Sequence, residues 1–428
     1  MKTASFFGVP MMLGVIMTLA FTAPAQAQDT PAPMTLDQAI ETAVKHSPHI
    51  AAASARTSAA AANRAQTGAL PNPELSIDVE NIYGGGAYNG FDSAETTYGI
   101  SQLIELPSKR GSRLRAADAE KTKADYAQQT STLDLLRDIH IAFAEVAAAQ
   151  QDVTIRQEQQ NLAAEVRSSV ISRVEAGKEP PIQKSKADIE FSASTIAAER
   201  ASRNLKAKQR TLALLIGATQ SALSVDSASM PPLSAPDEIE AYRTRLHATP
   251  DLKAMNTGIE QAEAGFAFEK ASTLPDPTLS LGVKDMRGED TQALVAGISF
   301  PIPVFNRNRA GIERAGYEVT AARMDLASTH NEREASLNTI YADYSSAYGE
   351  AKALEATVLP GAEEAFHFAR EGYAAGKFGY LEVLDAQRTL FDARAQLNTA
   401  ILEYHRQRAQ IERLTAAHLQ PTGKETSQ

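Results

Sequence analysis

The sequence contains no cysteine. The chain therefore has no disulfide, no thiolate metal ligand, no cysteine nucleophile and no lipid-bearing N-terminal cysteine of the kind that some envelope proteins carry. After residue 27 it also lacks any run of the roughly 20 apolar residues that a membrane-spanning helix needs. If the mature protein enters a membrane, it must do so with β-strands.

Sequence motifs of common enzymes are missing as well. There is no phosphate-binding loop, no GxSxG motif and no dinucleotide fingerprint. The eight histidines are the remaining place to look for a metal site. His46 and His49 are close, but Pro48 between them breaks helical geometry, no third ligand is near, and the other histidines are scattered singly. The sequence predicts no enzyme, no cofactor and no metal site.

The N-terminus carries the pattern of an export signal. Lys2 precedes an apolar segment, residues 6–21, that is followed by Ala25-Gln26-Ala27, the small-x-small pattern that a signal peptidase cuts. The alternative is a membrane anchor, for which about 16 mostly apolar residues is short. We expect residues 1–27 to be a signal peptide. Loss of Lys2 would change the formal net charge from -10 to -11, which argues against a nucleic-acid partner and suits a cation-tolerant channel interior.

The rest of the chain contains an internal repeat, in which similar residues recur about 200 positions apart. The matching pairs are Pro48 and Pro250, Pro73 and Pro277, Tyr98-Gly99-Ile100-Ser101 and Ala296-Gly297-Ile298-Ser299, Pro107 and Pro303, and Ala176-Gly177-Lys178 and Ala375-Gly376-Lys377. We expect a first repeat at residues 28–216, an irregular crossover at 217–237, a second repeat at 238–417 and a disordered tail at 418–428.

Each repeat shows the same order of expected elements: a helix, two strands, a very long helix, a tight turn and another helix. The first helix should begin at Thr35, with Gln38 completing a capping box, and run through the alanine-rich segment to Ala69. The fold class that this order indicates is mainly α with a small β part.

The two long helices are expected to start after Pro107 and Pro303 and to continue to Gly177 and Gly376. Each would have roughly 65 to 70 residues and a length of about 100 Å. Apolar residues three and four apart along them form a coiled-coil seam. These include Leu136, Ile139, Phe143, Val146 and Val153 in the first helix, and Leu337, Ile340, Tyr344, Ala347, Ala351 and Leu354 in the second. No globular domain needs such rods.

Four segments alternate between apolar and polar residues, as half-buried strands do. They are residues 74–80, 96–106, 277–283 and 292–302. Lengths of about 8 to 11 residues suit tilted membrane strands around a water-filled barrel. Two hairpins cannot close a barrel, so several chains would have to share one. The alternative is two soluble hairpins packed on the helices.

The most specific segment of the sequence is Glu371-Gly372-Tyr373-Ala374-Ala375-Gly376-Lys377-Phe378-Gly379-Tyr380-Leu381-Glu382-Val383-Leu384-Asp385-Ala386-Gln387. It is similar to the periplasmic helix-turn-helix tip of the TolC family of outer-membrane efflux proteins, with Glu382 in place of an aspartate. The sequence resembles this family over roughly residues 35–415. Residues 104–110 and 300–308 resemble the strand-to-helix passages of the heavy-metal-efflux, CzcC-like branch.

The resemblance implies a homotrimer in the outer membrane. Four strands per chain would form one shared twelve-stranded transmembrane barrel in contact with outer-membrane lipid, and the long helices would form a coiled-coil tunnel across the periplasm. It also implies two partners, a periplasmic adaptor that docks on the tips and an inner-membrane transporter of the RND type. The function expected is the exit duct of a tripartite efflux system for cations or heavy metals.

The same resemblance assigns roles at the tips. Glu382 and Asp385 match the family's acidic aperture ring, and Tyr373 matches a tyrosine that ties the closed tip. Three residues apart, the two carboxylates share a helix face. The alternatives are two solvated acids at a helix start and an ordinary packed tyrosine. Gln183 and Phe378 replace the family's aspartate and arginine, so closure must use other contacts.

Adaptor docking falls on the two tip turns. The residues expected there are Gly177, Lys178, Gly376, Lys377 and Phe378, of which the glycines allow the backbone to reverse. Two other functions remain open. One is a soluble periplasmic coiled-coil adaptor, which would share the export signal and the rods. The other is the same duct serving drug efflux or type I secretion.

Overall fold

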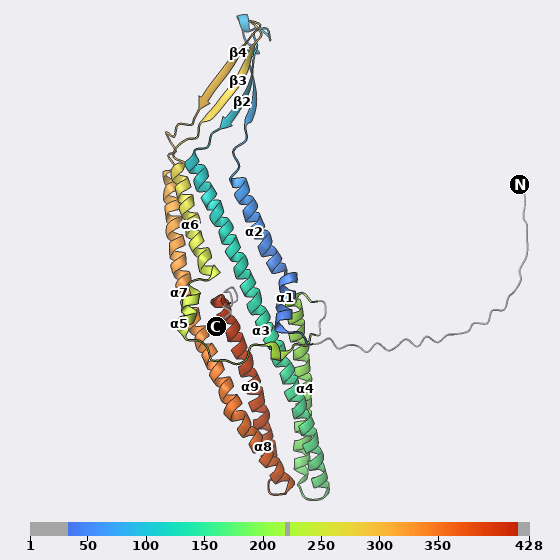
Figure 1. Cartoon of the computed structure of the whole chain (residues 1–428). Coiled ribbons are helices and arrows are strands. Elements are labelled where there is room, and N and C mark those ends of the chain that lie inside the picture. Colours follow the sequence, from blue (N-terminus) through green and yellow to red (C-terminus); the bar gives the residue numbers. More distant parts are fainter. Residues whose placement is uncertain (1–32, 219–222, 418–428) are drawn as a thin grey trace, which may run out of the picture.

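The computed structural model describes residues 33–218 and 223–417. The predicted signal peptide, residues 1–27, and the predicted tail, 418–428, lie outside the described residues, as does part of the crossover. Figure 1 shows an elongated molecule with a small sheet at one end and helical hairpins at the other. The mainly helical class with one small sheet is confirmed.

The elements follow one order in both halves. The first half contains α1 (Leu36–His46), α2 (Pro48–Thr67), β1 (Glu74–Glu80), β2 (Glu95–Leu103), α3 (Pro107–Glu175) and α4 (Pro181–Ile216). The second contains α5 (Ile239–Leu246), α6 (Pro250–Ala271), β3 (Thr278–Met286), β4 (Thr291–Ser299), α7 (Arg309–Ala353), a π-helical turn (Leu354–Val358), α8 (Leu359–Ala374) and α9 (Tyr380–Leu414).

The first helix is capped as expected but is shorter than expected. Thr35 and Gln38 form the predicted capping box at the start of α1. The helix ends at His46, because Ser47 takes an extended conformation and its side chain accepts a hydrogen bond from Ile50 N at the start of α2. Pro48 then occupies the first position of α2, where its missing N–H costs nothing. The single helix predicted from Thr35 to Ala69 was therefore wrong.

The two long helices differ. α3 is unbroken over 69 residues, as predicted. The second rod starts at Arg309, because Pro301 and Pro303 hold the preceding chain extended. It is also interrupted by the π-helical turn at Leu354–Val358. Pro360, just after this turn, has no N–H for the regular hydrogen-bond ladder, and a π-turn is one way in which a helix absorbs that loss.

The four strands form one antiparallel sheet in the order β1-β2-β3-β4. Its register aligns apolar side chains into rows that cross all four strands, Leu75–Ile100–Leu281–Ala296 and Ile77–Tyr98–Val283–Leu294. Most of these side chains are exposed, up to 77% for Leu75. β2 and β4 end three residues earlier than predicted, since prolines follow at 107, 301 and 303 and cannot donate to a sheet ladder.

The opposite face of the sheet carries small and polar residues. A carbon added at Gly282 would lie 2.8 Å from the carbonyl oxygen of Tyr98, and one added at Gly297 would lie 2.8 Å from Ser280 Oγ. Lys284 Nζ lies 2.7 Å from Glu80 Oε2 and 2.5 Å from Glu95 Oε2 on neighbouring strands. The sheet is therefore amphipathic, with one apolar and one polar face, as the alternation predicted.

Polar contacts connect the ends of the sheet to the starts of the long helices. Asp276, just before β3, accepts hydrogen bonds from Lys109 Nζ at 2.7 Å and from Leu106 N at 2.9 Å, at the start of α3. Lys109 is buried. At the start of α7, Asn308 Nδ2 donates to Glu269 Oε2 at 2.6 Å. Both strand-to-helix passages are therefore held by a partner from α6 or the segment that follows it.

Two apolar cores lie along the helices, one around Ile139, Phe143 and Val146 of α3 and one around Tyr344 of α7 and Tyr404 of α9. No helix among the described residues is both long and apolar enough to cross a membrane.

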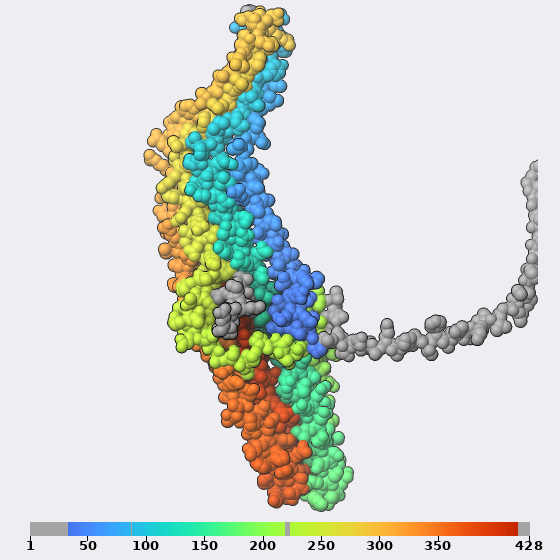
Figure 2. All heavy atoms as spheres, viewed as in Figure 1, coloured from blue at the N-terminus to red at the C-terminus, as the bar shows by residue number. Residues whose placement is uncertain are grey.

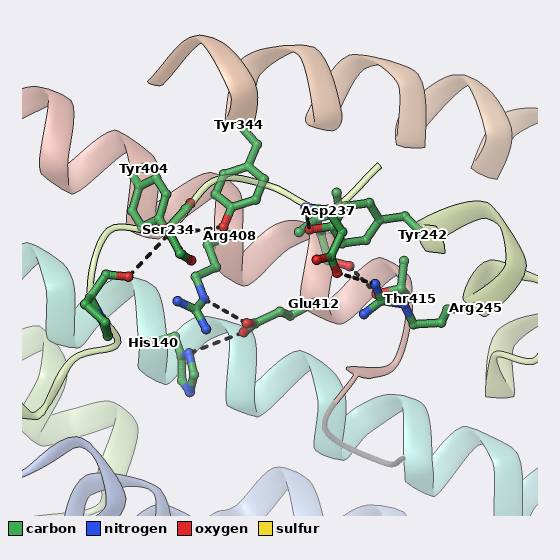
Figure 3. A network of polar contacts seen from close by, with 12 residues as sticks. His140, Ser234, Asp237, Tyr242, Arg245, Tyr344, Tyr404, Arg408, Glu412 and Thr415 are labelled. Atoms are coloured by element: carbon green, nitrogen blue, oxygen red, sulfur yellow. Dashed lines mark hydrogen bonds and ion pairs between the residues drawn. The ribbon is translucent and has the colours of Figure 1, made fainter. Parts of the chain in front are cut away.

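The crossover is tied to the second core by the polar network of Figure 3. Tyr404 Oη accepts a hydrogen bond from Ser234 N at 2.9 Å and lies 3.3 Å from Tyr344 Oη. Next to it, Arg408 Nε donates to Glu412 at 2.9 Å.

His405 makes stability depend on pH. Burial, with a smaller contribution from the charge of Arg408, lowers the pKa of His405 to about 4. Its unfolded pKa is near 6.5, so the unfolded chain binds more protons and stability falls as the pH drops from about 6.5 towards 4. His405→Gln should remove this part of the loss, on the order of 3 kcal/mol, in thermal unfolding between pH 7 and 4.5. Replacement of the exposed His49 by Gln should leave the slope unchanged, and an unaltered slope in His405→Gln would contradict the prediction.

Candidate functional site at the helical tips

Two helical hairpins, α3–α4 and α8–α9, end side by side at the pole opposite the sheet (Figure 1). Both reverse at a glycine in the left-handed region, with φ of 70° at Gly177 and at Gly376. In each, the N–H of the following lysine closes the helix end: Lys178 N donates to Arg173 O and Lys377 N to Gly372 O, both at 2.8 Å. The glycines act as the sequence predicted.

The residues expected to dock an adaptor all lie on the outside of these turns. Gly177, Lys178, Gly376, Lys377 and Phe378 are exposed. Phe378 packs one face against the backbone of Gly372, where an added carbon would lie 2.2 Å from the ring. Nearly half of the Phe378 side chain still faces solvent. The two turns therefore present two lysines and one aromatic ring.

The two hairpins share one apolar core. It consists of Val170 of α3, Ala187 of α4, Tyr373 of α8, and Tyr380, Val383 and Leu384 of α9. Because all four helices contribute, this core holds the hairpins together within one chain.

Tyr373 is buried at the centre of this core. The guanidinium of Arg173 lies 4.5 Å from the centre of its ring, and Arg173 Nη1 donates to the Tyr373 carbonyl oxygen at 3.2 Å. Burial raises the pKa of the Tyr373 hydroxyl. Tyr373 was identified from the sequence, whereas Arg173 was missed. No sequence signal pairs Arg173 with Tyr373, because the two residues are 200 apart in the sequence and lie on different helices.

Glu382 and Asp385 both lie exposed near the start of α9. Glu382 is in the first turn, where the helix dipole favours a carboxylate, and its Oε2 folds back towards Gly379. One turn further, Arg388 Nη2 donates to Glu190 of α4 at 2.8 Å, which raises the pKa of Arg388. Within one chain the two acids therefore face solvent, and the arginine beside them is engaged by the other hairpin.

Several buried polar atoms at the tip lack a hydrogen-bond partner among the described residues. They are Arg173 Nε, Gln183 Oε1, Tyr373 Oη and Gln387 Nε2. Orphaned buried groups each cost roughly 1 to 3 kcal/mol. Gln183 is the residue that replaces the aspartate of the resembled family, and no tie from Gln183 to Phe378 forms. The two hairpins of this chain are joined instead by Arg173 with Tyr373 and by Glu190 with Arg388.

Comparison with known proteins gives a family and relatives. The family model described as "Outer membrane efflux protein" matches residues 39–218 and 241–417. The cobalt-zinc-cadmium resistance protein CzcC of Cupriavidus metallidurans is 28% identical over 87% of this chain and 87% of the relative. The nickel-cobalt-cadmium resistance protein NccC of Alcaligenes xylosoxydans xylosoxydans is 26% identical over 76% of this chain and 72% of the relative.

Solved structures share the fold. The outer membrane protein VceC of Vibrio cholerae aligns with a TM-score of 0.73 and 19% identity, covering 89% of this chain and 95% of VceC.

The Arg173–Tyr373 contact should limit the separation of the two hairpins. Arg173→Ala removes a cation–π interaction of about 1 to 2 kcal/mol. Because the chain has no native cysteine, spin labels can be placed on cysteines at Lys178 and Lys377. Arg173→Ala should broaden the distance distribution between the labels towards longer values. Arg203→Ala, on the exposed surface of α4, should not. Identical distributions for all three proteins would refute a holding role for Arg173.

Proposed function

Because this chain belongs to the outer membrane efflux protein family, we propose that it is the exit duct of a tripartite system that expels divalent heavy-metal cations. The single observation that supports metal cations as the cargo is the match with the cobalt-zinc-cadmium resistance protein over 87% of both chains. The family supports the duct in the outer membrane, and the similarity to that relative supports its cargo. Exposed carboxylates at the tip suit a cationic cargo.

Three copies would complete the sheet. β1 and β4 are edge strands in the described chain, and an exposed edge invites pairing with another strand. Pairing β4 of one copy with β1 of the next would satisfy both edges. It would also gather the exposed apolar rows on the outside, where outer-membrane lipid covers them, and leave the polar face around a bore.

The helices offer a second contact between copies. Ile182, Ile189 and Ile196 of α4 are seven residues apart and 58%, 69% and 64% exposed. Seven-residue spacing places the three isoleucines on one face of α4, at one of the two apolar positions that each heptad of a coiled coil uses. In the proposed trimer, this stripe packs on a neighbouring copy.

Threefold symmetry would bring six carboxylates, Glu382 and Asp385 of each chain, around one axis. Like charges at that spacing repel one another and attract cations. The aperture would therefore resist complete closure and favour cations over anions. The exposed turn residues Lys178, Lys377 and Phe378 would meet the periplasmic adaptor, which connects the duct to an inner-membrane transporter of the RND type.

The cargo is tested in cells. A strain that lacks the gene should accumulate more zinc, cobalt or cadmium and tolerate less of it, and the intact gene should restore tolerance. Restored export of an organic compound or a protein, with metal tolerance unchanged, would reassign the cargo but keep the duct. A protein recovered as a soluble periplasmic monomer would favour an adaptor instead.

The carboxylates are tested in a planar bilayer. Glu382→Ala combined with Asp385→Ala should lower the preference of the channel for cations over anions, because the carboxylates that attract cations are removed. The control is Glu371→Ala, an exposed acid on α8. If the double variant keeps wild-type selectivity, the acids are solvated surface groups.

The proposed contact of α4 with a neighbouring copy is tested by measuring the mass of the purified particle. Ile189→Glu would bury a charge in the proposed seam, at a cost of several kcal/mol per chain, and should lower the mass of the detergent-purified particle from three chains towards one. Ile189→Leu keeps the apolar contact and should remain trimeric. A trimer in both variants would place the seam elsewhere.

A further inference from the structure

Two histidines and a glutamate that are far apart in the sequence lie together between α5 and α7. His247 caps the end of α5, and His330 and Glu334 are on α7. One ligand atom from each of the three lies within 4.8 Å of the other two. Within the described residues this is the one such group of three. It could not be predicted from the sequence, because 83 residues separate the histidines.

The spacing of the two imidazoles suits a shared cation. His330 Nε2 lies 3.4 Å from His247 Nδ1, and the ring planes differ by 20°. Two ligands bound at 2.0 to 2.1 Å to a tetrahedral metal lie about 3.4 Å apart. The nitrogens therefore stand at the separation that a metal would impose, and the stacked rings would turn so that both in-plane lone pairs meet at the ion.

The third donor comes from the same helix face as His330. Glu334 is four residues after His330, and residues at this spacing are neighbours on a helix. Arg243 Nε donates to Glu334 Oε2 at 3.1 Å, which orients the carboxylate as an outer hydrogen bond orients a metal ligand. Arg243 is also paired with Glu240, so two carboxylates face one guanidinium.

The site is open to solvent on one side. His247 and His330 line a cavity of about 430 Å³ together with Asn256, Arg323 and Asn331. Arg323 is held by Glu263 at 2.7 Å, which offsets its charge. The cavity leaves room for a water molecule as a fourth ligand and gives a cation a path of entry.

We propose that His247, His330 and Glu334 bind one divalent cation of the zinc, cobalt or nickel class, with water completing the coordination. Two nitrogen donors and one oxygen suit these metals, whereas calcium and magnesium take oxygen ligands. The ion would cross-link α5 to α7 and so pin the start of the second half onto its long rod. The proposal depends on these three side chains and not on the cargo of the duct.

The test is zinc titration of the chelator-stripped, full-length protein, purified without a histidine tag. Calorimetry should show one zinc per chain at this site. His247→Ala and His330→Ala should each weaken binding at least tenfold, and Glu334→Gln about tenfold, in line with the loss of a metal ligand or its support. Zinc should raise the unfolding temperature of the wild type and not that of the two histidine variants.

His367 supplies a matched control. It lies 3.3 Å from Glu371 four residues on, on α8, and so reproduces the histidine–glutamate pair without a second imidazole. His367→Ala should bind zinc as the wild type does. Unfolding temperatures in chelator show whether each variant folds, and because His247 is exposed, His247→Ala is expected to fold.

Two results overturn the site: no zinc binding by the wild type, or undiminished binding by folded His247→Ala. Failure of the duct would appear separately, as loss of bilayer conductance in protein that still binds zinc.

Discussion

The apolar face of the small sheet is the feature on which the rest of the molecule depends. Leu75, Ile77, Leu294 and Ile298 lie in register and are 60% to 77% exposed. A contiguous apolar surface of this kind is costly in water and favourable in lipid. Four strands alone also leave two open edges, and hydrocarbon does not tolerate unpaired backbone groups. These features of the sheet support the proposed assembly, in which copies meet in a membrane.

The long helices connect the sheet to the tips at the opposite end of the molecule (Figure 1). Asp276 and Glu269 tie each strand-to-helix passage to the start of a rod. As Figure 2 shows, the helical body continues without a break to the tips, and the described part of the crossover lies across its middle on the face in view. Contacts there among Ser234, Tyr344 and Tyr404 tie the crossover to the second half. The helices that hold the sheet therefore also reach the tips: α3 directly, and α7 through the π-helical turn and α8.

At the tips, contacts within a chain hold two hairpins together, and in the proposed trimer the acids of different chains would repel one another. Arg173 with Tyr373 and Glu190 with Arg388 hold the two hairpins of one copy together. The acids Glu382 and Asp385 stay exposed, and they are the groups that would crowd one another around an axis. The orphaned polar atoms of Gln183 and Gln387 add a cost to the arrangement seen here. In the proposed trimer, a closed aperture would be held within each chain by these two contacts.

The sequence predicted most of the local structure, because strict alternation from Leu75 to Val79 and the glycines of the two turns act over a few residues. It overran the strands at Phe300 and Ile302, where apolar residues continue the pattern but Pro301 and Pro303 end the pairing. It missed the π-turn at Leu354–Val358, since helical spacing persists through it. Arg173 and the His247–His330 pair were out of reach, because their partners come from other helices.

The most direct test of the account is the environment of the sheet. Because no native cysteine interferes, single fluorescent labels can be attached at Leu294→Cys on the apolar face and at Asp78→Cys on the polar face. In outer-membrane vesicles, spin-labelled lipid should quench the label at position 294 strongly and a water-soluble quencher should reach only the label at position 78. Quenching of both labels from water, with none from lipid, would contradict a sheet that sits in the membrane.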